Sequence, residues 1–343
     1  MTRAAFAIPG DINLPTGGYT YDRRVLGLLA QFAVAVHHLP LPGGFPDPSA
    51  CDLAETERLL RAIADEVVVI DGLAYGAMPA RLIAQVRVPI IALVHHPLYL
   101  EAGLSARRQR LLKGRERAAL ALARHVVVTS ASTACTLGRQ FAVPRAKITV
   151  AEPGTDRAPR ARGSAGDEVR LLSVGAIVPR KDYATLVRAL VPLKRHRWRL
   201  SIAGPTDRSR QAVGAVRAAM AEAGLENRIM LVGPVSQSQL ADFYARADVF
   251  VLPSLYEGYG MALSEAMARG LAIVCTTGGA AAQTVPDAAA LTEALGRLLS
   301  DAALRRRLAD ASWAAGRRLP SWHAAARCIA GVIKDVAAME VGP

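Results

Sequence analysis

The stretch that decides the fold is DVFVLPSLYEGYGMALSEAMARGLAIVCTT, residues 248–277. A short apolar run that predicts a buried strand, DVFVLPS, precedes a glycine-containing loop, a helical pattern from about Gly260 and a second apolar run. A strand, a helix and a further strand in this order are typical of parallel α/β architecture. Two glutamates flank the glycines: Glu257 is expected in the loop and Glu265 in the second turn of the helix.

The same alternation of apolar runs and helical patterns extends outward through the chain. In the first half, the runs that predict strands are residues 5–8, 32–38, 66–71, 89–96, 125–130 and 147–152. In the second half they are residues 169–175, 198–204, 228–233, 248–254 and 271–277. Because these runs are apolar almost throughout, we expect each strand to be buried on both faces of a sheet.

The length of the chain predicts more than one hydrophobic core. At 343 residues it exceeds the usual size of a single domain. Residues 157–168, RAPRARGSAGDE, combine proline, glycine and mixed charge without periodicity, which is typical of a linker. We therefore expect an α/β protein of two doubly wound, Rossmann-like domains, 1–160 and 161–318, facing a central cleft, and a C-terminal helical segment, 319–343.

The cysteines and apolar runs of the sequence indicate the compartment in which the protein is found. The four cysteines lie far apart without a CxxC pair, which argues against a disulfide framework or zinc ribbon and favours a reducing compartment. The first apolar run stops at Pro9 and is too short for a signal peptide, and no uncharged stretch has the apolarity of a membrane span. We expect a cytoplasmic protein, either free or peripheral at the inner membrane face.

The net charge of +13 suits nucleic acid, acidic lipid or a phosphorylated substrate. An arginine-rich composition is equally the product of a GC-rich genome with no such partner. Nucleic acid is disfavoured because the basic residues are not interleaved with aromatic ones.

Two segments of the first half place polar groups where strands end. Gly17 and Gly18 follow the first strand, where glycine lets backbone amides approach a phosphate or sugar, or simply forms a turn. His95 and His96 end the fourth strand, where a histidine can donate a hydrogen bond to a sugar or phosphate, or transfer a proton near neutral pH. The alternative is a structural pair ahead of Pro97; a metal site is disfavoured because no third ligand has a recognisable spacing.

In the second half, Arg180 and Lys181 lie in the turn after the first strand, where paired cations would neutralise a diphosphate. An exposed Arg-Lys pair is otherwise merely solvated. The backbone N–H groups from Tyr259 to Ala262 form a helix N-terminus, which favours an anionic group between the two glutamates.

These segments resemble the retaining glycosyltransferases of the GT-B fold, family four, over most of the chain. The most specific match is the E-x7-E pattern in EGYGMALSE. Further matches are the TGG loop, ALVHH, TSASTACTL, ITVAEPGTD, SVGAIVPRKD, IAGP and ADVFVLPS. In this fold the terminal helix packs back on the N-terminal domain, so Trp322 is expected to be a packing residue.

The resemblance implies a role for each matched residue. Glu257 would contact hydroxyls of the donor sugar and act in catalysis with His95, which matches a histidine that contacts the transferred sugar. The remaining donor-binding residues would be Gly17, Gly18, Arg180, Lys181, Gly258, Tyr259, Gly260, Met261 and Glu265, the last on the ribose of the nucleotide. His96 and Tyr19 would lie on the acceptor side. His96 is also the alternative to His95 as the match for the family's sugar-contacting histidine.

The implied reaction is transfer of a hexose from a UDP- or GDP-linked sugar to an acceptor with retention of configuration, without a metal or other cofactor. Two departures favour an alternative, a nucleotide-sugar-binding regulatory or degenerate GT-B protein. Ala176 stands where the family usually has arginine, and the segment after Gly279 is shorter than usual. A nucleotide-sugar epimerase, which shares the two-domain fold, is disfavoured by the motifs.

The acceptor is expected to be a small molecule, a glycan or a lipid held by the N-terminal domain. The basic segment from Arg107 to Arg124 carries Leu111, Leu112, Ala119 and Leu122, which fall with the preceding Leu104 near one helical face. Such a helix could contact an anionic membrane, guide a phosphorylated or carboxylated acceptor, or be an ordinary solvated helix.

Overall fold

The computed structural model describes residues 1–276 and 288–339, and the chain forms two compact units. The first unit comprises Met1–Gly154 and the C-terminal segment from Pro320, and the second comprises Thr155–Leu319. The whole segment predicted as a linker, residues 157–168, therefore belongs to the second unit. There the backbone amides of Ala161 and Arg162 donate to the carbonyls of Arg269 and Ala245.

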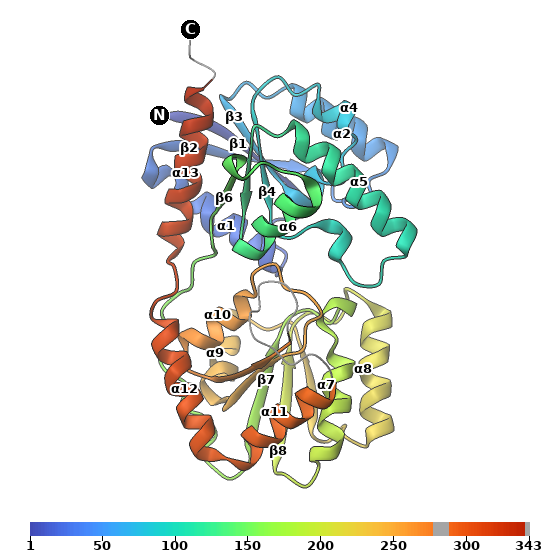
Figure 1. The fold of residues 1–343 in the computed structure, drawn as a ribbon, viewed down its shortest axis with the longest axis vertical. Coiled ribbons are helices and arrows are strands. Elements are labelled where there is room, and N and C mark those ends of the chain that lie inside the picture. The colour runs from blue at the N-terminus through green and yellow to red at the C-terminus, as the bar shows by residue number, and fades with distance from the viewer. Residues whose placement is uncertain (277–287, 340–343) are drawn as a thin grey trace. The chain divides into compact units, whose positions relative to one another are not determined.

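The first unit contains a six-stranded sheet in the order β2-β1-β3-β4-β5-β6, and all its pairs are parallel (Figure 1). The strands are β1 (Thr2–Pro9), β2 (Val34–Leu41), β3 (Val67–Asp71), β4 (Ile90–Val94), β5 (His125–Val128) and β6 (Ile148–Val150). The central strands β3 and β4 are buried throughout, as their uninterrupted apolar sequences predict.

The second strand departs from the prediction in two ways. The strand starts after Phe32, which belongs to a short 3-10 helix (Ala30–Phe32). Ala33 follows this helix in the left-handed conformation, with a φ of 57°, and separates it from the strand. Burial on both faces is also wrong for this strand, since β2 is an edge strand and its His37 is exposed. An edge strand with one solvated face needs fewer apolar side chains than a central one.

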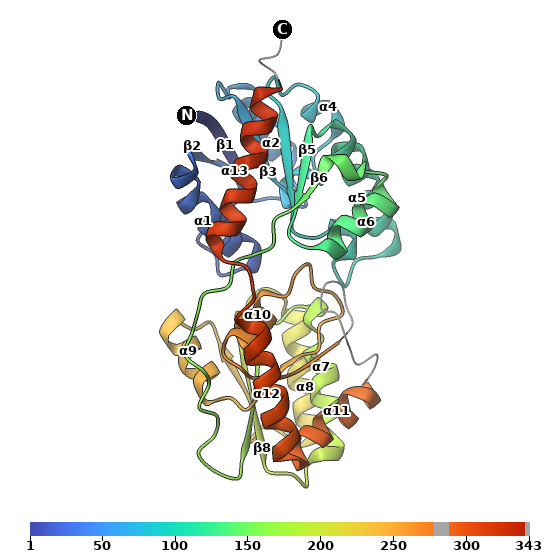
Figure 2. The same ribbon diagram turned by 60° about the vertical axis from the view of Figure 1, so that its left-hand side comes forward.

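The helices of the first unit are α1 (Gly17–Leu29), α2 (Ala50–Arg61), α3 (Gly72–Tyr75), α4 (Ala80–Ile83), α5 (Ala106–Leu122), α6 (Ala131–Phe141) and α13 (Trp322–Ala338), with 3-10 turns at Leu98–Leu100 and Arg145–Lys147. Figure 2 shows α13 running past α1 along the sheet of this unit. Trp322 is buried, and its ring centroid lies 5.9 Å from that of Tyr21 on α1. A Cβ at Gly154 would overlap the backbone of Trp322, so glycine is needed where the chain passes the start of α13.

The basic helix α5 buries Leu112 and Ala119 in the core, whereas Leu111 and Leu122 are 43% and 44% exposed. The predicted apolar face is thus divided between core and solvent. Arg108 pairs with Asp47 rather than remaining free for a ligand. Contact of this helix with a membrane stays a prediction, and no described helix is long and apolar enough to cross one.

Helix α6 ends at Ala142, which adopts the left-handed conformation with φ 58° and ψ 31°. A Cβ is strained there, so Ala142→Gly is expected to raise the free energy of unfolding of this unit by about 1 kcal/mol. The matched change Ala134→Gly, inside the same helix, is expected to lower it by about 1 kcal/mol. Denaturant unfolding of both variants checks the prediction, which is wrong if the two substitutions change stability in the same direction.

The second unit contains a five-stranded sheet in the order β11-β10-β7-β8-β9, again with parallel pairs. The strands are β7 (Val169–Val174), β8 (Trp198–Ala203), β9 (Ile229–Gly233), β10 (Val249–Leu252) and β11 (Ala272–Cys275). The helices are α7 (Tyr183–Leu190), α8 (Arg210–Ala223), α9 (Gln237–Arg246), α10 (Met261–Ala268), α11 (Ala288–Ser300) and α12 (Ala302–Gly316), with 3-10 turns at Pro179–Lys181 and Val191–Leu193. Two parallel-sheet, Rossmann-like units confirm the predicted fold class.

Candidate active site

The loop between β10 and α10, together with α10 itself, carries the two glutamates as the sequence predicts. Glu257 lies in the loop, and Glu265 lies in the second turn of α10, which begins at Met261. Gly260 is the N-cap of α10 and has a φ of 89°, a conformation that costs a residue with a Cβ about 1 kcal/mol or more. The amides of Met261 and Ala262 stand in the first turn, where a helix offers N–H groups to an anion.

Glu257 is 6% exposed and is held by two cations from the turn after β7. Lys181 Nζ lies 2.6 Å from Glu257 Oε1, and Arg180 Nη1 lies 3.5 Å from Oε2. Arg180 also donates to the carbonyl oxygen of Tyr256 at 2.7 Å. Burial alone would raise the pKa of Glu257, but the attraction of Lys181 and then Arg180 outweighs it and holds the pKa below its ordinary value.

The Lys181 side chain lies against a glycine at the end of β7. A Cβ at Gly175 would come within 3.0 Å of Lys181 Cε and 3.3 Å of its Nζ. The backbone of Gly175 also accepts a hydrogen bond from the hydroxyl of Tyr183 at 3.3 Å. Ala176, where the family usually has arginine, follows directly, so the cations at this strand end are supplied by the next turn of chain.

Glu265 is fixed by a buried tyrosine from the preceding helix, α9. The Tyr244 hydroxyl donates to Glu265 Oε2 at 2.9 Å, and the Arg269 guanidinium lies over the Tyr244 ring at 4.4 Å from its centroid. Burial raises the pKa of Glu265, although the Tyr244 hydrogen bond and Arg269 oppose the rise. The Tyr244 hydrogen bond therefore fixes the orientation of the Glu265 carboxyl group.

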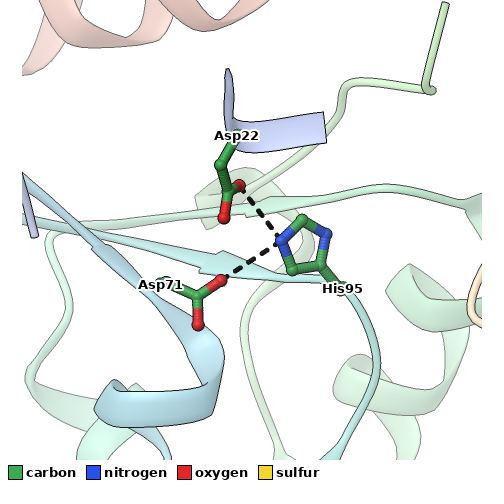
Figure 3. A group of neighbouring side chains, drawn as sticks. All are labelled: Asp22, Asp71 and His95. Atoms are coloured by element: carbon green, nitrogen blue, oxygen red, sulfur yellow. Dashed lines mark hydrogen bonds and ion pairs between the residues drawn. The ribbon is translucent and has the colours of Figure 1, made fainter. Parts of the chain in front are cut away.

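The first unit contains a separate cluster around His95, which follows β4 directly. His95 Nε2 lies 3.2 Å from Asp22 Oδ1 on α1 and 3.2 Å from Asp71 Oδ2 at the end of β3 (Figure 3). Asp22 is fully buried and Asp71 is 2% exposed. The Thr129 hydroxyl donates to the carbonyl of His95 at 3.1 Å, which fixes its backbone.

The protonation of this cluster differs from that of isolated side chains. Burial raises the pKa of Asp22 to about 7, opposed by the attraction of His95 and increased by repulsion from Asp71. Burial would lower the pKa of His95, but Asp22 and then Asp71 raise it to about 10. The imidazole is therefore positively charged at neutral pH.

Gly18 explains how α1 can approach this histidine. A Cβ at Gly18 would lie 3.2 Å from His95 Cδ2, so any larger residue would press on the ring. Gly17 begins α1, and the Thr16 side chain caps the helix by accepting from the amide of Tyr19. The structure thus brings the predicted glycine loop and His95 together.

The predicted acceptor-side residues have local partners. Tyr19 is buried, and its hydroxyl donates to the carbonyl of Pro9 at 2.6 Å. His96 Nε2 lies 3.3 Å from Glu101 Oε2. The shortened segment after Gly279 lies outside the described residues.

Asp22, Asp71 and His95 are also the one group of potential metal-binding side chains found within residues 1–276 and 288–339, with donor atoms within 4.8 Å of one another. Their separations of 3.2 Å are those of hydrogen-bonded ion pairs. The second oxygen of Asp71 is engaged elsewhere, because Oδ1 accepts from the amide of Leu73 at 2.8 Å and caps α3.

Three residues of these sites were not predicted. Asp71 carried a usable signal, since it ends a predicted strand just as His95 does. Asp22 lies one turn of helix beyond Gly18, which was a weaker indication. No signal in the sequence pointed to Tyr244, because its role depends on how α9 packs against α10.

Each unit matches a glycosyltransferase family. Residues 17–158 match the family described as Glycosyltransferase Family 4, and residues 168–301 match the family described as Glycosyl transferases group 1. The chain therefore belongs to the glycosyltransferases of group 1 and family 4, and its fold is GT-B.

Curated relatives agree with this assignment. The chain is 28% identical over 333 residues to an MMP α-(1→4)-mannosyltransferase of Mycolicibacterium hassiacum, with 86% of this chain and 77% of the relative covered. It is 32% identical over 194 residues to a D-inositol 3-phosphate glycosyltransferase of Kineococcus radiotolerans, where 50% of this chain and 43% of the relative are covered. The chain thus matches less than half of the length of this second relative.

Solved structures share the fold. A sucrose-phosphate synthase from Thermosynechococcus elongatus superposes with a TM-score of 0.83 at 22% identity, covering 98% of this chain and 100% of that one. HepE of Anabaena, in complex with UDP and glucose, superposes with a TM-score of 0.74 at 15% identity, covering 96% of this chain and 99% of that one. At these identities the likeness supports the fold alone.

Proposed function

We propose that the protein transfers a hexose from a UDP- or GDP-linked sugar to an acceptor, with retention of configuration and without a metal. The observation that carries the proposal is the arrangement at the start of α10. There, Glu257 with its two cations and the oriented Glu265 flank the helix N-terminus formed by Gly260 and Met261.

Each part of this arrangement suits one part of a nucleotide sugar. The helix N-terminus, Arg180 and Lys181 offer donors and positive charge to the diphosphate. Glu265 would accept hydrogen bonds from the ribose hydroxyls, and Glu257 from hydroxyls of the sugar. Gly258 and Tyr259 would complete the loop around the donor, and His95 would contact the transferred sugar. HepE, which binds UDP and glucose, shares the fold.

Lys181 and Arg180 both contact Glu257, so a bound diphosphate would share these cations with the carboxylate. Charge on the leaving diphosphate would then be stabilised by groups already in place.

The acceptor is proposed to be a small molecule, a glycan or a lipid. One relative is a D-inositol 3-phosphate glycosyltransferase, and a phosphorylated or carboxylated acceptor would suit the basic character of the chain. A lipid acceptor would fit peripheral contact of α5 with an anionic membrane, where Leu111 and Leu122 are exposed among arginines.

Donor binding can be tested with Glu265→Gln, which keeps the shape of the side chain and removes its charge. UDP and GDP sugars are expected to raise the melting temperature of the unaltered protein. The affinity for the stabilising nucleotide is expected to fall about tenfold or more in the variant, because a hydrogen bond to a charged group contributes about 1.5–3 kcal/mol. Isothermal titration calorimetry measures the change.

The matched control is Glu222→Gln, an exposed glutamate on α8 of the same unit, which is expected to leave the affinity unchanged. If no nucleotide sugar stabilises the unaltered protein, the transferase proposal is wrong. If Glu265→Gln binds as tightly as the control, the ribose role passes to another residue.

A further inference from the structure

The His95 ring is held through one nitrogen by two buried carboxylates from different elements. We propose that Asp22 and Asp71 are positioning residues that keep His95 as a fixed imidazolium, so that it serves as a permanent hydrogen-bond donor to a sugar hydroxyl and not as a proton-accepting base. This deepens the proposed function and rests on it for the identity of the ligand.

The geometry assigns different tasks to the two ring nitrogens. Both carboxylates approach Nε2, at 3.2 Å each, whereas Nδ1 has no hydrogen-bond partner among residues 1–276 and 288–339 (Figure 3). In an imidazolium both nitrogens carry a proton. Nε2 is therefore used to hold the ring, and Nδ1–H is the group left for a ligand on a side chain that is 20% exposed.

The surroundings prevent the ring from turning. Gly18 lies against one edge, and the Tyr21 ring meets the imidazole edge-to-face with centroids 5.4 Å apart. Tyr21 is itself held, because its hydroxyl donates to the carbonyl of Ala151 at 2.8 Å and Trp322 packs against its ring.

The charges of the cluster determine which ligand it suits. Among the described residues, the titratable groups facing the ring are Asp22 and Tyr21 from α1 and Asp71 from β3; Trp322, from α13, is uncharged and packs on Tyr21. Two carboxylates and one imidazolium leave a net charge of zero or below, depending on whether Asp22 is protonated. Such a cluster repels a phosphate when it is negative and does not attract one when it is neutral. In both states it can donate to a neutral hydroxyl, so the sugar is the better ligand.

Buried carboxylates need a positive partner, and His95 is the cation that both of them contact. Removing the proton of His95 would leave two negative carboxylates without this cation, and one of them, Asp22, is fully buried. Because burying an unpaired charge is costly, the ring stays protonated over a wide range of pH. The raised pKa values of His95 and Asp22 described above agree with this account.

The test is the protonation of His95, followed by NMR of 15N-labelled histidine side chains across a pH titration. The chain has seven histidines, and the His95 signals are assigned as those lost in His95→Gln. In the unaltered protein both ring nitrogens are expected to stay protonated at pH 8, where an ordinary histidine is neutral. Asp22→Asn and Asp71→Asn, which preserve shape, are each expected to lower the titration midpoint by about one pH unit or more.

The control is Asp65→Asn, which removes the carboxylate beside the half-exposed His37 in the same unit and is expected to leave His95 unchanged. Titration of His95 in the unaltered protein near the ordinary histidine pKa would overturn the proposal without any variant. So would unchanged midpoints in folded Asp22→Asn and Asp71→Asn. The NMR titration is carried out without substrate, so its outcome does not depend on the donor-binding test with Glu265→Gln. If the donor-binding test failed, His95 would lose the sugar as its proposed ligand, but the proposal about its protonation would stand.

Discussion

Replacing Lys181 by methionine is expected to lower the free energy of unfolding of the second unit by about 3 kcal/mol. The substitution keeps the length of the side chain but leaves the 6% exposed Glu257 carboxylate with Arg180 alone, at 3.5 Å. Removing one partner of a buried ion pair costs about 3–5 kcal/mol, and Arg180 reduces that cost. Hydrogen exchange of the β7 and β8 amides measures this change in stability, since the amides of these core strands exchange only when the whole second unit unfolds.

The stability lost in Lys181→Met should depend on pH and on the presence of the Glu257 carboxylate. In the unaltered protein the pKa of Glu257 is below its ordinary value of 4.5, so its stabilising contribution is present above that pH and is lost as the pH falls through the lowered pKa. The pKa rises when Lys181 is removed, and the difference between the two proteins should therefore narrow in acid. The double variant Lys181→Met with Glu257→Gln is expected to regain at least half of the loss; equal stability of single and double variants would contradict the ion-pair explanation.

The second large effect is expected from Gly154→Ala in the first unit. The added Cβ would overlap the backbone of Trp322, and backbone atoms at the start of a helix cannot yield as a flexible side chain can. Overpacking of this kind costs about 3 kcal/mol or more when the backbone must shift. We expect faster hydrogen exchange along α13 and a loosened Tyr21 ring, because Trp322 packs against it.

The matched control is Gly27→Ala on α1, where a Cβ would meet no described atom within 4 Å. Alanine is the better helix former, so this variant is expected to gain about 0.5–1 kcal/mol. If both alanine variants have the same stability, the close approach at Gly154 does not matter to the fold.

The parts of the fold that were predictable are those that depend on local sequence. The strand, loop and helix around Glu257 and Glu265 follow from apolar runs and glycines within thirty residues, and they are found where expected. The start of β2 was placed too early because Phe32 and the left-handed Ala33 look like the beginning of an apolar strand.

The parts that were not predictable depend on packing between distant segments. The cluster of Asp22, Asp71 and His95 requires the order β1-β3-β4 and the tilt of α1 across it, neither of which is written in any one motif. Similarly, α5 presents Leu112 to the core and Leu111 to solvent, a distinction of one residue that a helical pattern interrupted by alanine and glycine does not make.

The path of the chain also sets an order of events during synthesis. The second unit is continuous, from Thr155 to Leu319, so all of its sequence is synthesised before that of the last helix. The first unit begins earlier but finishes later, since α13 covers α1 only after the C-terminal segment has emerged. The nascent protein therefore carries an incomplete first unit, with the surface around Tyr21 uncovered, until α13 has emerged and packed. A stop codon near residue 320 would leave the second unit whole and that surface permanently open to chaperones and proteases.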